Sequence, residues 1–453
     1  MRASRRLALA TLICFWASAT PAWAKPASWS APATLSPCAS NEMPVAVFPR
    51  DKPTHGTGPG AAVWSAPRSC PQGGGIYVAQ IDPATDAPDK PAYARTPGGG
   101  RLAMRPTLGV APAPHGQIAI GGSASDPGRA DGQLVQGRVG GSFAPLGPLV
   151  GEVTTSSLAT GYLGDVAAFS PTAGSRAGAN VFVERYFARA LSPPRTVPAH
   201  AGRVEFGTVG LDFRTDAIAV WRQGGALLAR DLPASGRAQP TQRLRGVSPA
   251  PRVAALISDD NRAIVAWADP GERATSIYFD YSGPGVRFGK PQLLERFEDP
   301  ERNYPPLSPR LVRLSSESVM LAWSGMQDGH WVVRSAAIDQ HGLGRVSTIS
   351  APGTDALLND LEPGPRGEAL AIWSEPQREP DGKLNLLEQA IVAARGIDTQ
   401  PDATIFGAPE QVAPPGPNSL PTVAFDPDSD RTLALWLGGG ARVRYSIRTP
   451  ATR

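Results

Sequence analysis

One short pattern recurs along the chain and limits what it can fold into. A polar turn is followed by a run of small and large apolar residues that ends in an aromatic residue. The run is apolar at nearly every position, so as a strand it must be covered on both faces. The clearest copies are GLDFRTDAIAVW (210–221), ALISDDNRAIVAW (255–267), VRLSSESVMLAW (312–323), EPGPRGEALAIW (362–373) and FDPDSDRTLALW (425–436). Weaker copies are ATGYLGDVAAFS (159–170), APAPHGQIAIGG (111–122) and GPGAAVWS (58–65).

The sequence around each copy completes a unit of four strands. The pattern itself predicts two strands joined by a tight polar turn. A third strand follows in IYVAQID (76–82), QLVQGRV (133–139), NVFVERYF (180–187), SIYFDYS (276–282), HWVVRSAAID (330–339) and ARVRYSIR (441–448). A fourth element, usually with a Pro before an apolar strand, is FAPLGPL (143–149), LSPPRTV (191–197), FGKPQLL (288–294) and FGAPEQV (406–412). Four antiparallel strands repeated radially, each sheet packed on the next, predict an all-β chain folded as a β-propeller.

The beginning of the chain supplies a strand that its end lacks. The last unit, residues 419–448, has three strands and no fourth. WSAPATL (29–35) matches FGAPEQV in the aromatic residue, the Pro three positions later and the apolar residue three positions after that. We therefore predict that residues 28–36 complete the last blade and close the ring, which covers two sheet edges.

The number of blades depends on residues 43–97. If PVAVF (44–48) is the first strand of the first unit, there are eight blades, which is the interpretation that we favour. If this region is an irregular insertion, seven blades remain. WSAPRSC (64–70) resembles WSAPATL and is either another fourth-strand element or the end of a second strand. We favour the second strand, because AAV precedes it and a clear third strand follows.

Two cysteines, Cys38 and Cys70, are predicted to form a disulfide. In an oxidising compartment an isolated pair is most simply a disulfide; a reduced pair and a metal site are the alternatives, and two thiols with no nearby His are a poor zinc set. Cys38 follows the fourth strand of the last blade, and Cys70 lies between the second and third strands of the first. These two types of loop emerge on the same face of a propeller, so the bond would lock the closing strand.

The first 24 residues have the features of a signal peptide. A basic region is followed by a short apolar run, Leu7 to Ala19, and by the small-x-small pattern Ala22-Trp23-Ala24. We expect cleavage near Ala24 and a secreted or periplasmic protein without a membrane anchor. The expected divisions are a signal peptide (1–24), an N-terminal closing strand (25–42), the β-propeller (43–449) and a C-terminal tail (450–453).

The charge of the exported chain argues against a nucleic-acid partner. Without the three arginines of the signal peptide, 41 basic residues face 40 acidic ones. The basic isoelectric point of the full chain therefore does not indicate a nucleic-acid-binding surface. We expect a monomer that binds an extracellular or envelope protein or a glycan.

Local motifs for catalysis are missing from the sequence. It contains no GxSxG element, no HExxH motif and no phosphate-binding loop. DPDSD (426–430) has the spacing of a calcium loop, but Arg431 and Leu437 replace the Gly and Glu that such a loop needs. Sister repeats have SDDN, SSES or GPRG in the same place, so we predict a hairpin turn. No metal and no cofactor is expected, and no catalytic residue is assigned.

Most tryptophans are explained by the repeat. Six of the eight in the exported chain share one repeat position, and Trp29 takes the aromatic position of the fourth strand, so all seven are predicted core residues. Trp331 occupies neither aromatic position of the repeat and directly follows His330. Two long loops, 295–306 and 374–383, should project on the face of the cysteines. The predicted binding residues are Arg302, Tyr304, His330 and Trp331.

The repeat resembles those of exported bacterial propeller proteins of unknown role, whose units read apolar-x-apolar-Trp and then aromatic-x-x-Pro-x-x-apolar. The resemblance covers roughly residues 28–448 and implies a fold but no activity. Sialidases also use a propeller, but their Asp-box, Ser/Thr-x-Asp-x-Gly-x-Thr-Trp, is absent. The leading hypothesis is a binding or scaffold propeller without enzymatic activity. The alternative is a propeller hydrolase or lyase acting on an extracellular glycan, with catalytic residues dispersed over several blades.

Overall fold

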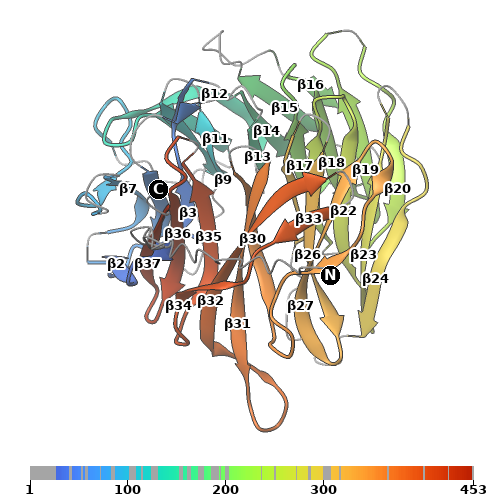
Figure 1. Cartoon of the computed structure of the whole chain (residues 1–453). Helices are drawn as coiled ribbons and strands as arrows, with labels where there is room; N and C mark the ends of the chain where they lie inside the picture. Colours follow the sequence, from blue (N-terminus) through green and yellow to red (C-terminus); the bar gives the residue numbers. More distant parts are fainter. Residues whose placement is uncertain are drawn as a thin grey trace, which may run out of the picture.

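Eight antiparallel sheets follow one another along the chain, and the computed structural model is an all-β propeller with eight blades (Figure 1). In Figure 1 the blue strands of blade 1 lie beside the red strands of blade 8. The predicted fold class and the count of eight blades are confirmed. The structure describes residues 27–39, 43–52, 55–56, 60–71, 73–82, 87–100, 109–113, 116–123, 131–152, 157–160, 165–171, 178–184, 193, 195–198, 202, 204–235, 237–248, 251–271, 273–283, 287–298, 308–315, 318–364, 367–400, 403–426 and 428–450. The expected signal peptide and residues 451–453 lie outside this part of the chain.

The first strands of the eight blades surround the axis of the ring. Each of them contacts the first strands of both neighbouring blades, including the first strands of blades 8 and 1. They are β3 (Val45–Val47), β9 (Gly109–Ala113), β13 (Ser157–Thr160), β17 (Val204–Leu211), β21 (Arg252–Ile257), β25 (Arg310–Arg313), β30 (Leu357–Pro363) and β35 (Ser419–Phe425). The strand predicted in PVAVF is thus the first strand of blade 1. A small extra hairpin, β4 (Arg50–Lys52) and β5 (His55–Gly56), follows it.

The second strands form the buried middle of each blade, as their apolar pattern predicts. They are β6 (Gly60–Ala66), β10 (Gln117–Ser123), β14 (Val166–Pro171), β18 (Ala217–Gln223), β22 (Ala263–Pro270), β26 (Val319–Gln327), β31 (Glu368–Arg378) and β36 (Thr432–Gly438). The six tryptophans of the repeat are at most 1% exposed. The indole N–H groups of Trp221, Trp373 and Trp436 donate to Gln223, Glu375 and Asn418, respectively. Because β6 ends at Ala66, the segment WSAPRSC begins at the end of a second strand.

The third and fourth strands complete the blades toward the outside. The third strands are β7 (Gly75–Ile81), β11 (Asp131–Gly137), β15 (Ala179–Glu184), β19 (Ala226–Leu232), β23 (Ala274–Tyr281), β27 (His330–Asp339), β32 (Leu384–Gln400) and β37 (Arg442–Thr449). The outer strands are β8 (Ala92–Tyr93), β12 (Phe143–Glu152), β16 (Arg195–Val197), β20 (Gln242–Gly246), β24 (Gln292–Glu298), β28 (Gly342–Leu343), β29 (Ser347–Thr348), β33 (Ala403–Phe406) and β34 (Glu410–Ala413). Among the described residues, no helix is long and apolar enough to cross a membrane.

The N-terminal segment closes the ring as predicted. β1 (Ser28–Trp29) and β2 (Ala33–Ser36) both pair antiparallel with β37, the third strand of blade 8. Between them, Ser30 accepts a hydrogen bond from the Ser446 hydroxyl at 2.7 Å. Leu35 is buried in the cluster that joins blades 8 and 1. This segment is the fourth strand of the last blade.

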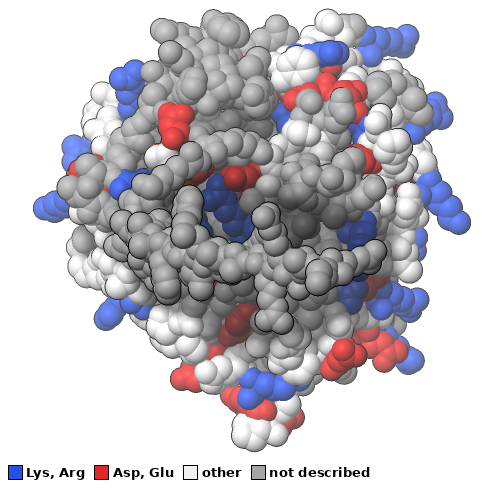
Figure 2. All heavy atoms as spheres, in the orientation of Figure 1, with Lys and Arg blue, Asp and Glu red and all other residues white. Residues whose placement is uncertain are grey.

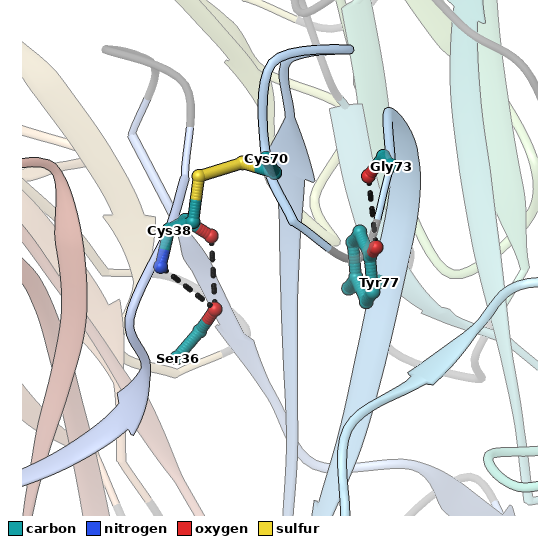
Figure 3. Close-up of a disulfide and its surroundings, with 5 residues drawn as sticks. All are labelled: Ser36, Cys38, Cys70, Gly73 and Tyr77. Carbon is teal, nitrogen blue, oxygen red and sulfur yellow. Dashed lines mark hydrogen bonds between the residues drawn. A yellow bond between two sulfur atoms is a disulfide. The ribbon is translucent and has the colours of Figure 1, made fainter.

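The disulfide joins the closing segment to blade 1 (Figure 3). Cys38 follows β2, and Cys70 lies between β6 and β7, with their Cα atoms 5.9 Å apart. The Ser36 hydroxyl donates to the Cys38 carbonyl at 2.8 Å, which fixes the chain just before the bond. The predicted pairing is therefore confirmed.

The turns between the first and second strands of blades 4 and 5 have the same geometry. In residues 212–216 and 258–262, the first N–H donates to the fifth carbonyl and the fourth N–H to the first carbonyl. The fourth residue has a positive φ in both turns, 66° at Thr215 and 62° at Asn261. Asn adopts this conformation readily, whereas a β-branched residue is strained there.

Thr215→Asn is expected to raise the free energy of unfolding by about 0.5–1 kcal/mol, because it relieves this strain. Neither Thr215 Oγ1 nor Asn261 Oδ1 has a hydrogen-bond partner, so the exchange removes no bond. Urea denaturation measures the change. The reverse exchange, Asn261→Thr, serves as the matched control and should destabilise the protein by a similar amount; effects of the same sign at both positions would contradict the explanation.

Candidate functional site on the cysteine face

One face of the ring carries the connections that follow the second and fourth strands of each blade. Cys38 follows a fourth strand and Cys70 a second strand, so we call this the cysteine face. The turn between β26 and β27, the hairpin between β31 and β32, and the connection from β29 to β30 lie on the same face.

A buried carboxylate joins blades 6 and 7 on the cysteine face. Asp355 lies between β29 and β30, and its side chain is 4% exposed. Arg378, the last residue of β31, donates from Nε to Oδ2 at 3.0 Å and from Nη2 to Oδ1 at 2.7 Å. The backbone N–H of Trp331 donates to Oδ1 at 2.9 Å, and Nδ1 of His330 lies 3.3 Å from Oδ2. Both oxygens of this carboxylate are therefore engaged.

These contacts keep Asp355 ionised. Burial alone raises the pKa of a carboxyl group, but here the hydrogen bonds from Arg378, Trp331 and His330 outweigh burial, and the pKa of Asp355 lies below its usual value. A carboxylate held in this way is a poor proton donor. Its role is to position the side chains around it.

The structure brings two of the four predicted binding residues into this cluster. The His330 side chain is 35% exposed at the beginning of β27. Trp331 is half-buried, with its ring edge-on to Phe297 of blade 5 at 5.1 Å between centroids. Arg302 and Tyr304 lie outside the described residues.

Arg378 ties the predicted loop 374–383 to the cluster. Its Nη2 donates to the Gly329 carbonyl at 3.0 Å, and its Nη1 donates to the Gly382 carbonyl at 2.8 Å. The β31–β32 hairpin that carries this loop projects from the molecule at the bottom of Figure 1. Leu387, at the bulge of β32 opposite Pro376 and Gln377, is 78% exposed. The loop is thus an ordered projection anchored by one arginine.

The axis of the ring contains a second polar group. Arg310 of blade 6 donates to the Asn359 carbonyl at 2.6 Å, and its Nε lies 3.9 Å from Asp360 of blade 7. The Asp360 carboxylate also accepts the N–H of Val423 in blade 8 at 3.2 Å. Burial raises the pKa of Asp360, whereas Arg310 and the backbone N–H groups lower it less. Figure 2 shows basic and acidic side chains together near the middle of the ring.

Asp360 lines a small cavity on the axis. The cavity has a volume of about 80 Å³ and lies between the first strands of blades 1, 2, 7 and 8. Its lining combines two carboxylates, Asp360 and Glu362, with apolar groups that include Phe48, Val110 and Phe425. This volume accommodates a few water molecules.

Two buried carboxylates on the opposite face have raised pKa values. Burial raises the pKa of Asp212 and of Asp280 to about 6, although backbone N–H groups in their own turns partly offset the effect. Asp280 is 3% exposed, accepts the N–H of Tyr281 at 2.8 Å, and has no partner for Oδ2. Neither carboxylate is open to a ligand.

Asp280→Asn is expected to flatten the pH dependence of stability. The pKa of Asp280 is about 6 in the folded state and 3.8, the ordinary value, in the unfolded chain, so the folded state binds more protons between these values, and stability falls as pH rises from about 4 to 7. The substitution should remove up to about 3 kcal/mol of that fall. Urea denaturation at pH 4.5 and 7.5 measures it. Asp89→Asn, at an exposed position, is the control, and an unchanged slope in Asp280→Asn would contradict the prediction.

Asp426 and residues 428–430 of the acidic segment lie in the predicted hairpin turn. The N–H of Asp426 donates to the Arg431 carbonyl at 2.8 Å, between β35 and β36. Asp426 Oδ1 accepts the N–H of Asp428 at 3.1 Å. In the part of the chain that the structure describes, no group of three or more His, Cys, Asp or Glu side chains has a geometry suited to a metal ion.

The sequence matches no protein-family model and no curated protein. Similar solved structures include an ulvan lyase of polysaccharide lyase family PL25, with 11% identity and a TM-score of 0.47 over 91% of this chain and 95% of that chain. An α-L-arabinofuranosidase from Fusarium graminearum has 10% identity and a TM-score of 0.35 over 73% and 88% of the two chains. The six-bladed lectin of Aleuria aurantia has 9% identity and a TM-score of 0.34 over 68% and 97%. None of these similarities assigns a role to a residue of this chain.

Proposed function

We propose that the protein is a secreted or periplasmic binding propeller, which recognises an extracellular or envelope protein or glycan through its cysteine face. The binding surface is the seam between blades 6 and 7, formed by His330, Trp331 and the β31–β32 hairpin. The disulfide is compatible with an oxidising compartment.

The observation that carries the proposal is the engagement of Asp355 by four donor groups. The carboxylate fixes the imidazole of His330, the backbone of Trp331 and the guanidinium of Arg378 relative to one another. His330 and Arg378 nevertheless remain about one-third exposed, at 35% and 36%. Exposed side chains held by buried partners lose little conformational entropy on binding, which favours recognition. The same contacts engage both oxygens of Asp355, so this carboxylate is not available for proton transfer.

Photo-crosslinking tests the proposal. A photo-reactive amino acid replaces His330 in cells that produce the protein. His341 is the matched control, because it is an exposed histidine just beyond the other end of β27, on the opposite face. We expect a discrete crosslinked partner from position 330 and none from position 341. With that partner purified, His330→Ala should weaken binding by about tenfold, and His341→Ala by less than twofold. Identical products from both positions, or none from 330, would refute it.

The hydrolase or lyase alternative rests on a different observation, the carboxylate of Asp360 with its raised pKa beside Arg310 on the axis. It predicts glycan turnover that Asp360→Asn abolishes. Chain scission measured by reducing ends and by absorbance of unsaturated products covers both reaction types. Turnover that is lost in this variant, while its melting temperature is retained, would replace the binding proposal.

A further inference from the structure

The outer parts of blades 4, 5 and 6 carry an unusual concentration of basic residues. The segments that lead into and form the outer strands of these blades are residues 233–248, 287–298 and 340–350. Together they contain only two acidic residues, Glu295 and Glu298. Their basic residues, all exposed, are Arg237, Arg243, Arg245, Arg287, Lys290, Arg296 and Arg345. We call these seven residues the basic rim.

The basic rim is not neutralised by the protein itself. Glu295 is occupied, because it accepts the indole N–H of Trp323 at 2.9 Å and lies 3.5 Å from Arg334. Within the described residues, none of the seven basic side chains takes part in an ion pair. Figure 2 shows Lys and Arg side chains projecting from the edge of the ring on the side of β20 and β24. The positive charge of this edge is therefore available to a partner.

Contacts between blades hold parts of the basic rim in place. Gln242 of blade 4 donates to the Phe288 carbonyl of blade 5 at 2.7 Å and accepts the Phe288 N–H at 3.0 Å. Arg243, Arg287 and Lys290 are one or two residues from this double hydrogen bond. The Arg245 guanidinium lies over the ring of Tyr278 in blade 5, 4.2 Å from its centroid. The charges of two blades are thus presented from a fixed backbone.

We propose that the basic rim binds a linear acidic polysaccharide through its carboxylate or sulfate groups. Guanidinium groups bind such anions with paired hydrogen bonds, and six of the seven residues are arginines. The rim spans the outer strands of three successive blades, so an extended, flexible polymer can reach from one blade to the next. Phe288 and Phe297, the only Phe, Tyr or Trp residues of these segments, are buried, so neither offers a stacking surface to nucleobases. The rim lies on the outer strands of blades 4 to 6, whereas the site proposed above lies between blades 6 and 7, and the inference does not depend on the function proposed for that site.

Binding of polygalacturonate and of chondroitin sulfate by the purified protein tests the inference, with dextran as the neutral polymer. We expect binding at 50 mM salt that weakens by about tenfold or more at 300 mM. The variant Arg243→Gln, Arg287→Gln, Lys290→Gln, Arg345→Gln should weaken binding by about tenfold or more. The control variant Arg68→Gln, Lys90→Gln, Arg95→Gln, Arg442→Gln removes the same charge from exposed positions of blades 1 and 8 and should change it less than twofold. Matching melting temperatures show that both variants fold.

Three outcomes would overturn the inference. The first is no binding of either acidic polysaccharide at low salt. The second is equal loss of binding in the rim and control variants, which would indicate net charge alone. The third is tighter binding of single-stranded or duplex DNA, or of phosphatidylglycerol vesicles, than of both polysaccharides.

Discussion

Deletion of residues 25–42 is expected to lower the apparent melting temperature by about 10 °C, where about 1 kcal/mol corresponds to 1 °C for a chain of this size. The deletion removes the two short strands that pair with β37, the buried side chain of Leu35, and the disulfide. It also leaves β37 as an open sheet edge, which favours aggregation. Scanning calorimetry and light scattering measure the two effects.

The double variant Cys38→Ser, Cys70→Ser separates the disulfide from the strands. Closing a loop of 32 residues contributes about 3–4 kcal/mol in the chain-entropy model, so this variant should lose only about a third of the stability lost by the deletion. Removal of residues 451–453 is the control for a change at a chain end. An unchanged melt in the deletion variant would show that the closing segment does not hold the ring together.

The fold could be predicted because its information is local and repeated. A strand that is apolar on both faces has few possible environments, and eight such strands at similar spacing, six of them with Trp at one repeat position, specify stacked sheets. The closing strand was identifiable for the same reason, since Pro32 and its flanking residues repeat the pattern of Pro409 and its neighbours. Each of these prolines directly precedes the strand that it introduces, β2 or β34, where no N–H is needed.

The candidate site could be predicted only in part, because its residues are distant in sequence and are brought together only when blades 6 and 7 pack. His330 and Trp331 stand out as departures from the repeat. Asp355, which organises them, lies in the plain loop APGTD, and no local pattern distinguishes it from a solvent-exposed turn residue. Arg378 belongs to loop 374–383, whose length and mixed charge make it a candidate from the sequence. Its hydrogen bonds to Asp355 and Gly329, however, depend on how blades 6 and 7 pack.

The polar contacts of Arg310 and Asp360 on the axis could not be predicted from the sequence for the same reason. Arg310, Asp360 and Val423 come from three successive blades, and the first and last are 113 positions apart in the sequence. Each first strand contributes one edge to the axis, and only closure of the ring brings those edges together. Local repeats therefore predict the blades, whereas polar contacts between blades require the assembled structure.

Arg313→Met is expected to lower the free energy of unfolding by about 3–5 kcal/mol. Arg313 ends the first strand of blade 6, and its Nη2 donates to the carbonyls that end the first strands of blades 4 and 5, Leu211 at 3.2 Å and Ile257 at 2.6 Å. Its Nη1 lies 2.9 Å from Asp259. Methionine retains the stem of the side chain but leaves two carbonyls and a half-buried carboxylate without their cation.

The pH dependence distinguishes this role from simple packing. Burial raises the pKa of Asp259 and Arg313 lowers it, so without Arg313 the pKa rises further and ionised Asp259 becomes more costly in the folded state. The loss in Arg313→Met should therefore be larger at pH 8 than at pH 5, as urea denaturation at both values would show. Arg313→Lys should restore part of the stability at pH 8, because it returns a cation near Asp259. Arg252→Met, at an exposed position in the neighbouring first strand, should change stability by less than about 0.5 kcal/mol. A loss that is equal at both pH values would mean that Arg313 acts through the two carbonyls or through packing, and not through the charge of Asp259.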